Sequence, residues 1–210
     1  MSMKKKKVKE ETKMKSSQKI NQIDSNAIKS IIESFWQDNT HDLYNEFSLQ
    51  FELGIYLRNK LDEKYLVEFE RNVSDFSINK KETCKKEIDI VIYTKDKKEK
   101  YAIELKFPVN GQYPEQMYKF IKDIQFMEEL RNNDFDGCYV LTLVNDDNFH
   151  NGQTEGIYKY FRSKKPITGT IHKPTGKGKG EASCEITGSY VIEWKQIKQN
   201  PNSWYYFLEI

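Results

Sequence analysis

Residues 86–107 read KEIDIVIYTKDKKEKYAIELKF. Within this stretch, 87–93 and 101–107 alternate in a period of two and are rich in β-branched and aromatic side chains, a pattern typical of strands. The segment 94–100 between them is strongly charged and has the length of a hairpin connection. The stretch therefore predicts two adjacent strands joined by a short turn.

The flanking sequence places this hairpin in an α/β fold. Before it, apolar residues recur every three or four positions in 25–36 and 43–61, which predicts two helices, and 65–73 predicts a first strand. After it, the pattern predicts helix 114–131, a central strand 137–146, a short helix 155–162, a mobile basic loop 173–183, and closing strands 189–194 and 204–210. This order predicts one domain, residues 24–210, built as an α/β sandwich on a mixed sheet.

Length and composition exclude several classes of protein. A chain of 210 residues with 13% aromatic residues can bury a core without disulfides or structural metals. No apolar run approaches the roughly 18–20 residues of a membrane helix, and the Lys-rich start lacks the apolar region of a secretory signal. The three isolated cysteines Cys84, Cys138 and Cys184 suit a reducing compartment and no zinc finger, so we expect a cytoplasmic protein without membrane contact.

The charge is distributed unevenly. Residues 1–19 carry eight lysines and two glutamates, a net charge of +6, which leaves −4 on the remainder of a chain whose total is +2. We expect residues 1–23 to form a basic, disordered tail. Such a tail contacts a polyanion or is simply solvated, and the sequence leaves both open.

The predicted strands carry charged residues that need a reason, because burying an unpaired carboxylate is costly. Glu104 and Lys106 share one face of their strand, and Asp89 precedes Glu104 by fifteen residues. The two carboxylates can meet only if the strands diverge or bend near Asp89. Converging carboxylates repel unless a proton or divalent cation lies between them, and Mg²⁺ suits such oxygen ligands. The alternative is that Glu104 and Lys106 are ordinary residues on a solvated face.

These motifs resemble the PD-(D/E)XK superfamily of nucleases over roughly residues 43–145. The resemblance implies a restriction-endonuclease-like α/β/α sandwich and an Mg²⁺- or Mn²⁺-dependent nuclease acting on DNA, in a restriction, repair or mobile-element system. It also implies that Asp89, Glu104 and the backbone carbonyl of Leu105 bind the metal. Lys106 would then orient or deprotonate the attacking water, or stabilise charge that develops on phosphorus.

A further acidic residue is expected from the leading helix of this resemblance. In NEFSLQFEL, Glu46 is followed by Leu-Gln and then Glu-Leu as in the family pattern, and it shares the inward stripe of Leu49 and Leu53. Glu46 is therefore the first candidate and Glu52 the alternative. The sequence departs from the namesake motif at Ile88, which stands where the family has proline.

Four lysines are candidates for nucleic-acid contacts. Lys119 and Lys122 lie on the predicted helix after the E-x-K motif, where Lys122-Asp123 resembles a family pair, and Lys177 and Lys179 lie in the basic loop. Exposed lysines also serve solubility alone. The competing hypothesis is a catalytically silent nucleic-acid-binding or regulatory protein with the same fold. Since no helix-turn-helix or zinc module is visible, a homodimer or a partner subunit is a possible source of specificity.

Overall fold

The computed structural model describes residues 19–24 and 26–210, so most of the expected basic tail lies outside the described residues. The helices are α1 (Ala27–Asp38), α2 (Glu46–Lys60), α3 (Tyr113–Arg131) and α4 (Tyr158–Arg162), with short 3-10 turns η1 (Val73–Phe76) and η2 (Asp147–Phe149). The strands are β1 (Tyr65–Asn72), β2 (Glu87–Thr94), β3 (Lys100–Lys106), β4 (Gly137–Val144), β5 (Ile167–His172), β6 (Ser183–Tyr190), β7 (Lys195–Ile197) and β8 (Asn200–Glu209).

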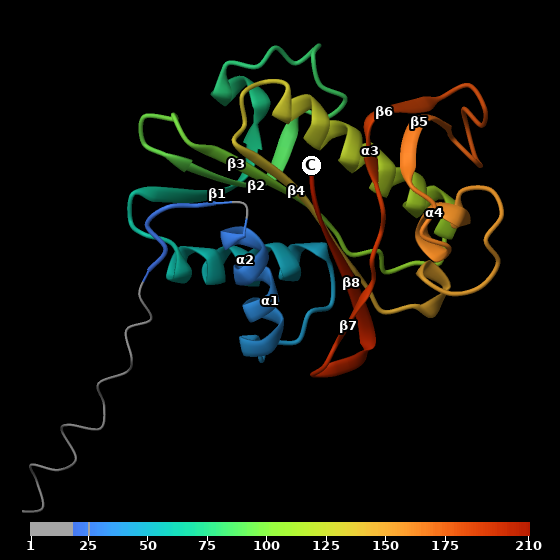
Figure 1. The fold of residues 1–210 in the computed structure, drawn as a ribbon, viewed down its shortest axis with the longest axis horizontal. Coiled ribbons are helices and arrows are strands. Elements are labelled where there is room, and N and C mark those ends of the chain that lie inside the picture. Colours follow the sequence, from blue (N-terminus) through green and yellow to red (C-terminus); the bar gives the residue numbers. More distant parts are fainter. Residues whose placement is uncertain (1–18, 25) are drawn as a thin grey trace, which may run out of the picture.

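A mixed six-stranded sheet in the order β1-β2-β3-β4-β8-β7 forms the centre of the molecule (Figure 1). Strands β3 and β4 are parallel and are connected through α3, whereas the other neighbouring pairs are antiparallel. Every residue of β4 is buried, as its continuous apolar run predicts for a strand covered on both faces. The predicted α/β class, the β2–β3 hairpin and the mixed sheet are therefore confirmed.

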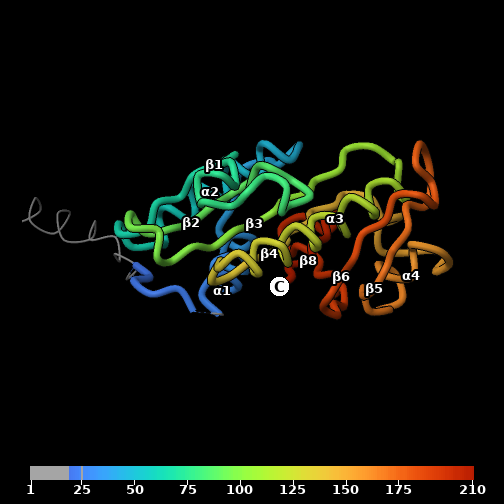
Figure 2. The backbone as a smooth tube through the Cα atoms, turned by 90° about the horizontal axis from the view of Figure 1, so that it is seen from above, coloured from blue at the N-terminus to red at the C-terminus, as the bar shows by residue number. Residues whose placement is uncertain are grey.

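Helices cover both faces of this sheet and divide the core in two. On one face, α1 and α2 pack on a cluster that includes Leu49, Leu53 and Ile103. On the other face, α3 packs on a cluster that includes Phe120 and Val140. The hairpin β5–β6 and helix α4 lie beside α3, at the end of the molecule away from β1 (Figure 2). The catalytic candidates of β2 and β3 thus lie between two helical layers.

Local sequence explains where the two site-bearing helices begin. The Asn45 side chain accepts a hydrogen bond from the Ser48 N–H at 2.8 Å, and Ser48 Oγ accepts one from the Asn45 N–H at 3.1 Å. This reciprocal capping satisfies two free donors and fixes the first turn of α2. Helix α3 has Pro114 in its first turn, where the missing N–H costs no hydrogen bond.

The C-terminal third differs from the expectation. The prediction of a strand at 189–194 is wrong, because the strand in this region is β6, which ends at Tyr190. Its antiparallel partner β5 is not among the predicted strands. Only alternate residues of β6, such as Cys184 and Ile186, are buried, so its pattern is mostly polar. The helix expected at 155–162 begins at Tyr158, because Gly156 has a φ of 58°, outside the helical region.

The folded part extends further toward the N-terminus than expected. Ile20 N donates to the Lys60 carbonyl, and Asp62 N donates to the Ile20 carbonyl, both at 2.9 Å. Ile23 is buried, and its N–H donates to the hydroxyl of Tyr65. Assigning 20–23 to the tail was therefore wrong.

Among the described helices, none combines the length and the apolar character needed to cross a bilayer.

Candidate active site

Strand β2 loses its regular alternation at Asp89. Residues two apart in a regular strand share a face, yet Ile88 joins the core beneath α3 while Ile90 joins the core beneath α2. The β2–β3 ladder ends at the pair Ile90–Ile103, immediately before Asp89 and Glu104. On the neighbouring strand, Glu70 has a positive φ of 50°. The divergence that the two carboxylates require is therefore present.

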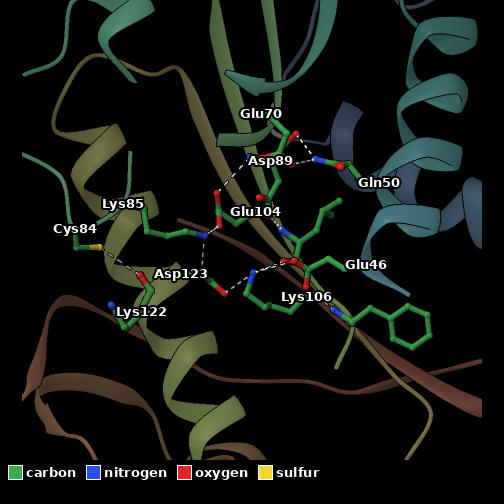
Figure 3. A network of polar contacts seen from close by, with 12 residues as sticks. Glu46, Gln50, Glu70, Cys84, Lys85, Asp89, Glu104, Lys106, Lys122 and Asp123 are labelled. Carbon is green, nitrogen blue, oxygen red and sulfur yellow. Dashed lines mark hydrogen bonds and ion pairs between the residues drawn. The ribbon is translucent and has the colours of Figure 1, made fainter. Parts of the chain in front are cut away.

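This divergence brings Asp89 to the backbone of β3. Asp89 Oδ2 accepts a hydrogen bond from the Leu105 N–H at 2.7 Å, and the Asp89 N–H lies 3.4 Å from Glu104 Oε1 (Figure 3). Glu104 is fully buried between β2 and β4. Burial, reinforced by the Asp89 carboxylate, raises the pKa of Glu104 well above its ordinary value. Burial also raises the pKa of Asp89, against the opposing effect of two lysines.

Two residues that were not assigned to the site complete its inner part. The Lys85 ammonium pairs with Glu104 Oε2 and lies 3.1 Å from Asp123 Oδ1. Asp123 comes from α3 and is almost completely buried, and its Oδ2 has no hydrogen-bond partner among the described residues. Burial lowers the pKa of Lys85, but the surrounding carboxylates, Asp123 first, outweigh it and raise the pKa overall. Lys85 therefore remains a cation between two acidic side chains.

Lys106 and Glu46 form the outer part. Lys106 Nζ donates to the Leu105 carbonyl at 2.6 Å and lies 3.5 Å from both Glu46 Oε1 and Asp123 Oδ2. Glu46 Oε2 accepts from the Phe107 N–H at 3.1 Å, which joins the start of α2 to the end of β3. Burial lowers the pKa of Lys106, yet Asp123 and other nearby carboxylates raise it overall, so the side chain is a proton donor. We call Glu46, Lys85, Asp89, Glu104, Lys106 and Asp123 the carboxylate–lysine cluster.

One neutral side chain braces this cluster from α2. Gln50 donates through Nε2 to the Asp89 carbonyl at 2.7 Å and to Glu70 Oε1 at 2.6 Å. These bonds hold the distorted strands where their own ladder is interrupted. Glu52, the alternative to Glu46, instead lies 3.9 Å from His41 and forms neither a hydrogen bond nor an ion pair with the residues of the cluster. Of the two acidic candidates, the structure brings only Glu46 to the site.

The candidate nucleic-acid lysines lie on and beside α3. Lys119 is exposed and Lys122 half-buried, and the loop that carries the exposed Lys177 and Lys179 connects β5 to β6. Its Thr175 donates to Glu115 Oε1 at 2.8 Å, so the loop is fastened one helical turn from Lys119. Three glycines of the loop have φ between 70° and 81°, a conformation that few other residues adopt.

The donor chemistry of the cluster suits a hard divalent cation. Its four carboxylates and two lysines sum to −2 when all are ionised, and carboxylate and carbonyl oxygens are the ligands that Mg²⁺ prefers. However, no group of three or more His, Cys, Asp or Glu among residues 19–24 and 26–210 is arranged to hold a metal directly. Since Lys85 lies between Glu104 and Asp123, a cation there would have to displace its ammonium.

The two inner residues differ in how visible they are in the sequence. Asp123 lies three residues after Phe120 and four before Met127, so the helical spacing places it on the inward face of α3. An acidic residue at such a position is the sequence feature that could have identified it. Lys85 lies in an irregular segment that contains several lysines, and nothing in its spacing distinguishes it.

Comparisons with protein-family models, curated proteins and solved structures found no match to this chain.

Proposed function

We propose that this chain is a magnesium-dependent nuclease of the PD-(D/E)XK type that hydrolyses phosphodiester bonds of DNA. One observation carries the proposal: the divergence of β2 from β3 sets the Asp89 carboxylate on the Leu105 N–H, beside Glu104 and Lys106. Burying the Glu104 carboxylate next to a second carboxylate costs free energy unless a positive charge compensates it. The strain of that arrangement is understandable if the two carboxylates serve to bind a cation.

Each side chain has a distinct role in this proposal. Asp89, Glu104 and the Leu105 carbonyl would hold Mg²⁺, which supplies Lewis-acid stabilisation of the phosphate and a more acidic water. Lys106 keeps its proton and donates to negative charge that develops on phosphorus as water attacks and the 3′ oxygen leaves in line. Glu46 holds the Lys106 ammonium in place from α2. The catalysis is then mainly positioning and charge neutralisation.

The surroundings of the cluster support the same proposal. Helices on both faces of a mixed sheet, with parallel β3 and β4 joined through α3, agree with a restriction-endonuclease-like arrangement. Lys119 is exposed on α3, and the loop with the exposed Lys177 and Lys179 is fastened to the first turn of that helix through Thr175, which offers phosphates cationic contacts despite the net acidic body.

A second candidate is a catalytically silent nucleic-acid-binding protein, and the position of Lys85 favours it. Its ammonium already forms ion pairs with both Glu104 and Asp123 without any metal. A protein that never binds a divalent cation gains stability from such a permanent internal cation. Under this alternative, the cluster stabilises the fold and DNA is bound without turnover.

Calorimetric titration with Mg²⁺ and Mn²⁺, followed by cleavage assays, separates the two candidates. The nuclease proposal expects saturable binding that Glu104→Gln removes, together with cation-dependent cleavage of plasmid DNA. Binding of DNA without metal binding or cleavage would support the silent protein. Absence of cleavage on duplex DNA, single strands and RNA alike would overturn the nuclease proposal.

A further inference from the structure

A pocket of about 320 Å³ adjoins the carboxylate–lysine cluster, at the edge of the sheet where the parallel strands β3 and β4 end. Phe107, the residue after Lys106, lines this pocket, and its N–H donates to Glu46 Oε2 at 3.1 Å. Ligands of α/β sheets commonly bind at this edge, outside the carboxyl ends of parallel strands. We call it the strand-end pocket, and its other walls include Tyr44, the loop 108–111 and residues 145–146.

Tyr44 gives the strand-end pocket an exposed aromatic ring on a fixed backbone. The residue is 67% exposed, and its N–H donates to Ser48 Oγ at 3.0 Å, so the first turn of α2 holds it in place. Val109, which is 70% exposed, adds apolar surface to the same pocket. Because the backbone at Tyr44 is already ordered, stacking a flat ligand on its ring costs little further conformational entropy.

Two asparagines of the strand-end pocket are held by their oxygens, which leaves their amide nitrogens for a ligand. Asn110 Oδ1 accepts from Gln116 Nε2 at 2.9 Å, and Asn145 Oδ1 accepts from Ser203 Oγ at 2.7 Å. Neither amide nitrogen donates a hydrogen bond to a residue within 19–24 and 26–210. The ring nitrogens and carbonyl oxygens of nucleobases are acceptors for such N–H groups. The lining thus combines a stacking surface with donors for the edge of a base.

The charge of the lining disfavours a phosphate in the strand-end pocket and allows a neutral base. Among the described residues that line it, none is lysine or arginine, and Asp146 is acidic. The hydrogen bond from the Tyr113 hydroxyl lowers the pKa of Asp146, so this carboxylate stays ionised at neutral pH. A phosphate is therefore repelled from the pocket, whereas the Lys106 ammonium attracts it to the neighbouring cluster.

We propose that the strand-end pocket binds the base of an unpaired nucleotide next to the scissile phosphate, with the base stacked on Tyr44. The proposal rests on the nuclease function proposed above, since that function places the phosphate beside Lys106. In a duplex, neighbouring bases cover both faces of each base, so Tyr44 can stack only on a base that has left the helix. The volume lies at the lower end of the roughly 300–1,000 Å³ of ligand pockets, which suits a single base. The substrate class is then single-stranded or locally unpaired DNA.

Binding of fluorescent single strands of about 12 nucleotides to the full chain, with a chelator present, tests the pocket apart from catalysis. The reference probe has the same length, with abasic deoxyribose at every position. Wild type should bind the strand with bases roughly tenfold more tightly, because each stacked base adds affinity. Tyr44→Ala should remove most of this preference, and Tyr44→Phe should keep it. The matched control is Phe51→Ala, an exposed aromatic residue of α2 that does not line the pocket. Equal binding of both strands by wild type, or equal preferences of Tyr44→Ala and Phe51→Ala, overturns the proposal.

Cleavage assays with Mg²⁺ separate a failure of this proposal from a failure of the nuclease function. Wild type should cut a single strand in preference to the same sequence in a duplex, and Tyr44→Ala should raise KM for the single strand roughly tenfold. Equal cleavage of both substrates, unchanged in Tyr44→Ala, would overturn the base-binding pocket and leave the nuclease function standing. Absence of cleavage, together with a preference for bases that depends on Tyr44, would overturn the nuclease function and support the pocket.

Discussion

Asp89 Oδ2 and the Leu105 N–H are 2.7 Å apart, so a side-chain carboxylate takes the place that a backbone carbonyl would hold in a continued β2–β3 ladder. This single hydrogen bond satisfies the Leu105 amide and fixes the position of the Asp89 carboxylate. It also fixes Asp89 relative to the two residues beside Leu105, Glu104 and Lys106. Substitution of Asp89 therefore affects both the strand pair and the charge of the site.

Neutralising Glu104 should leave the metal-free protein as stable as wild type or more stable. Glu104→Gln removes a buried charge beside Asp89, which predicts an unchanged or higher free energy of unfolding, by about 1 kcal/mol. Chemical denaturation with a chelator present measures it. Glu104→Gln should also lose the rise in melting temperature that we expect Mg²⁺ to give wild type. A destabilised variant with a full Mg²⁺ shift would contradict the site assignment.

The stability of the metal-free protein should depend on pH through the same carboxyls. The folded-state pKa of Glu104 and of Asp89 is raised, so the folded protein binds more protons than the unfolded chain above about pH 4. The stability that the protonated carboxyls of Glu104 and Asp89 contribute is therefore fully present below the unfolded pKa. It is lost as pH rises through the folded pKa. Comparing wild type with Glu104→Gln across this range isolates the effect, because the other carboxyls are common to both. Parallel pH profiles would exclude a raised Glu104 pKa.

Removing the Lys85 ammonium should strengthen Mg²⁺ binding. Lys85→Met leaves Glu104 and Asp123 without their shared cation, so the metal-free protein should lose about 1–3 kcal/mol, since Lys85 is partly exposed. The Mg²⁺-induced rise in melting temperature should then exceed that of wild type. Lys122→Met, which changes a lysine of α3 that forms no ion pair with the cluster residues, is the control. An equal Mg²⁺ response in wild type and Lys85→Met would show that Lys85 does not compete with metal.

Lys106 should be required for cleavage but not for metal binding. Lys106→Met removes a charge donor and no oxygen ligand, so cleavage should fall by roughly 10²–10³-fold while Mg²⁺ affinity is kept or increased. Cleavage rates and calorimetry on the same preparation measure both. Loss of Mg²⁺ binding in this variant would mean that Lys106 acts by shaping the metal site.

The loop lysines should contribute to DNA affinity through phosphates. If Lys177 and Lys179 each contact one phosphate, replacing both by alanine should reduce the slope of log affinity against log salt by about 1.8 on duplex DNA. Replacing Lys95 and Lys98 is the control, because both lie in the β2–β3 turn, at the opposite end of these strands from Asp89. Equal slopes for the two double variants would leave the loop without a role in binding.

The central sheet was predictable because each of its long strands buries one face or both. Alternation in β1, β2 and β3 and the apolar run of β4 each carry that signal. The placement of Asp89 and Glu104 on neighbouring strands followed from it, whereas the divergence that brings them together was a condition and not a prediction. The β5–β6 pair was not predictable, since most of its side chains face solvent. Lys85 was hidden for a different reason: its position depends on how an irregular loop packs on α3, and no periodicity encodes that packing.

The parallel pairing of β3 with β4 has a consequence for the order of folding. The β2–β3 hairpin closes over a short turn, so its contacts are local, whereas β4 reaches β3 only after α3 has crossed the sheet. We therefore expect Glu104 to stay hydrated while only the hairpin has formed and to lose its water when β4 docks. Its desolvation falls on the late, non-local step, at which Asp123 arrives on the same crossover and brings a second acid to the Lys85 ammonium. We expect variants of Glu104 to change the unfolding rate more than the formation of the hairpin.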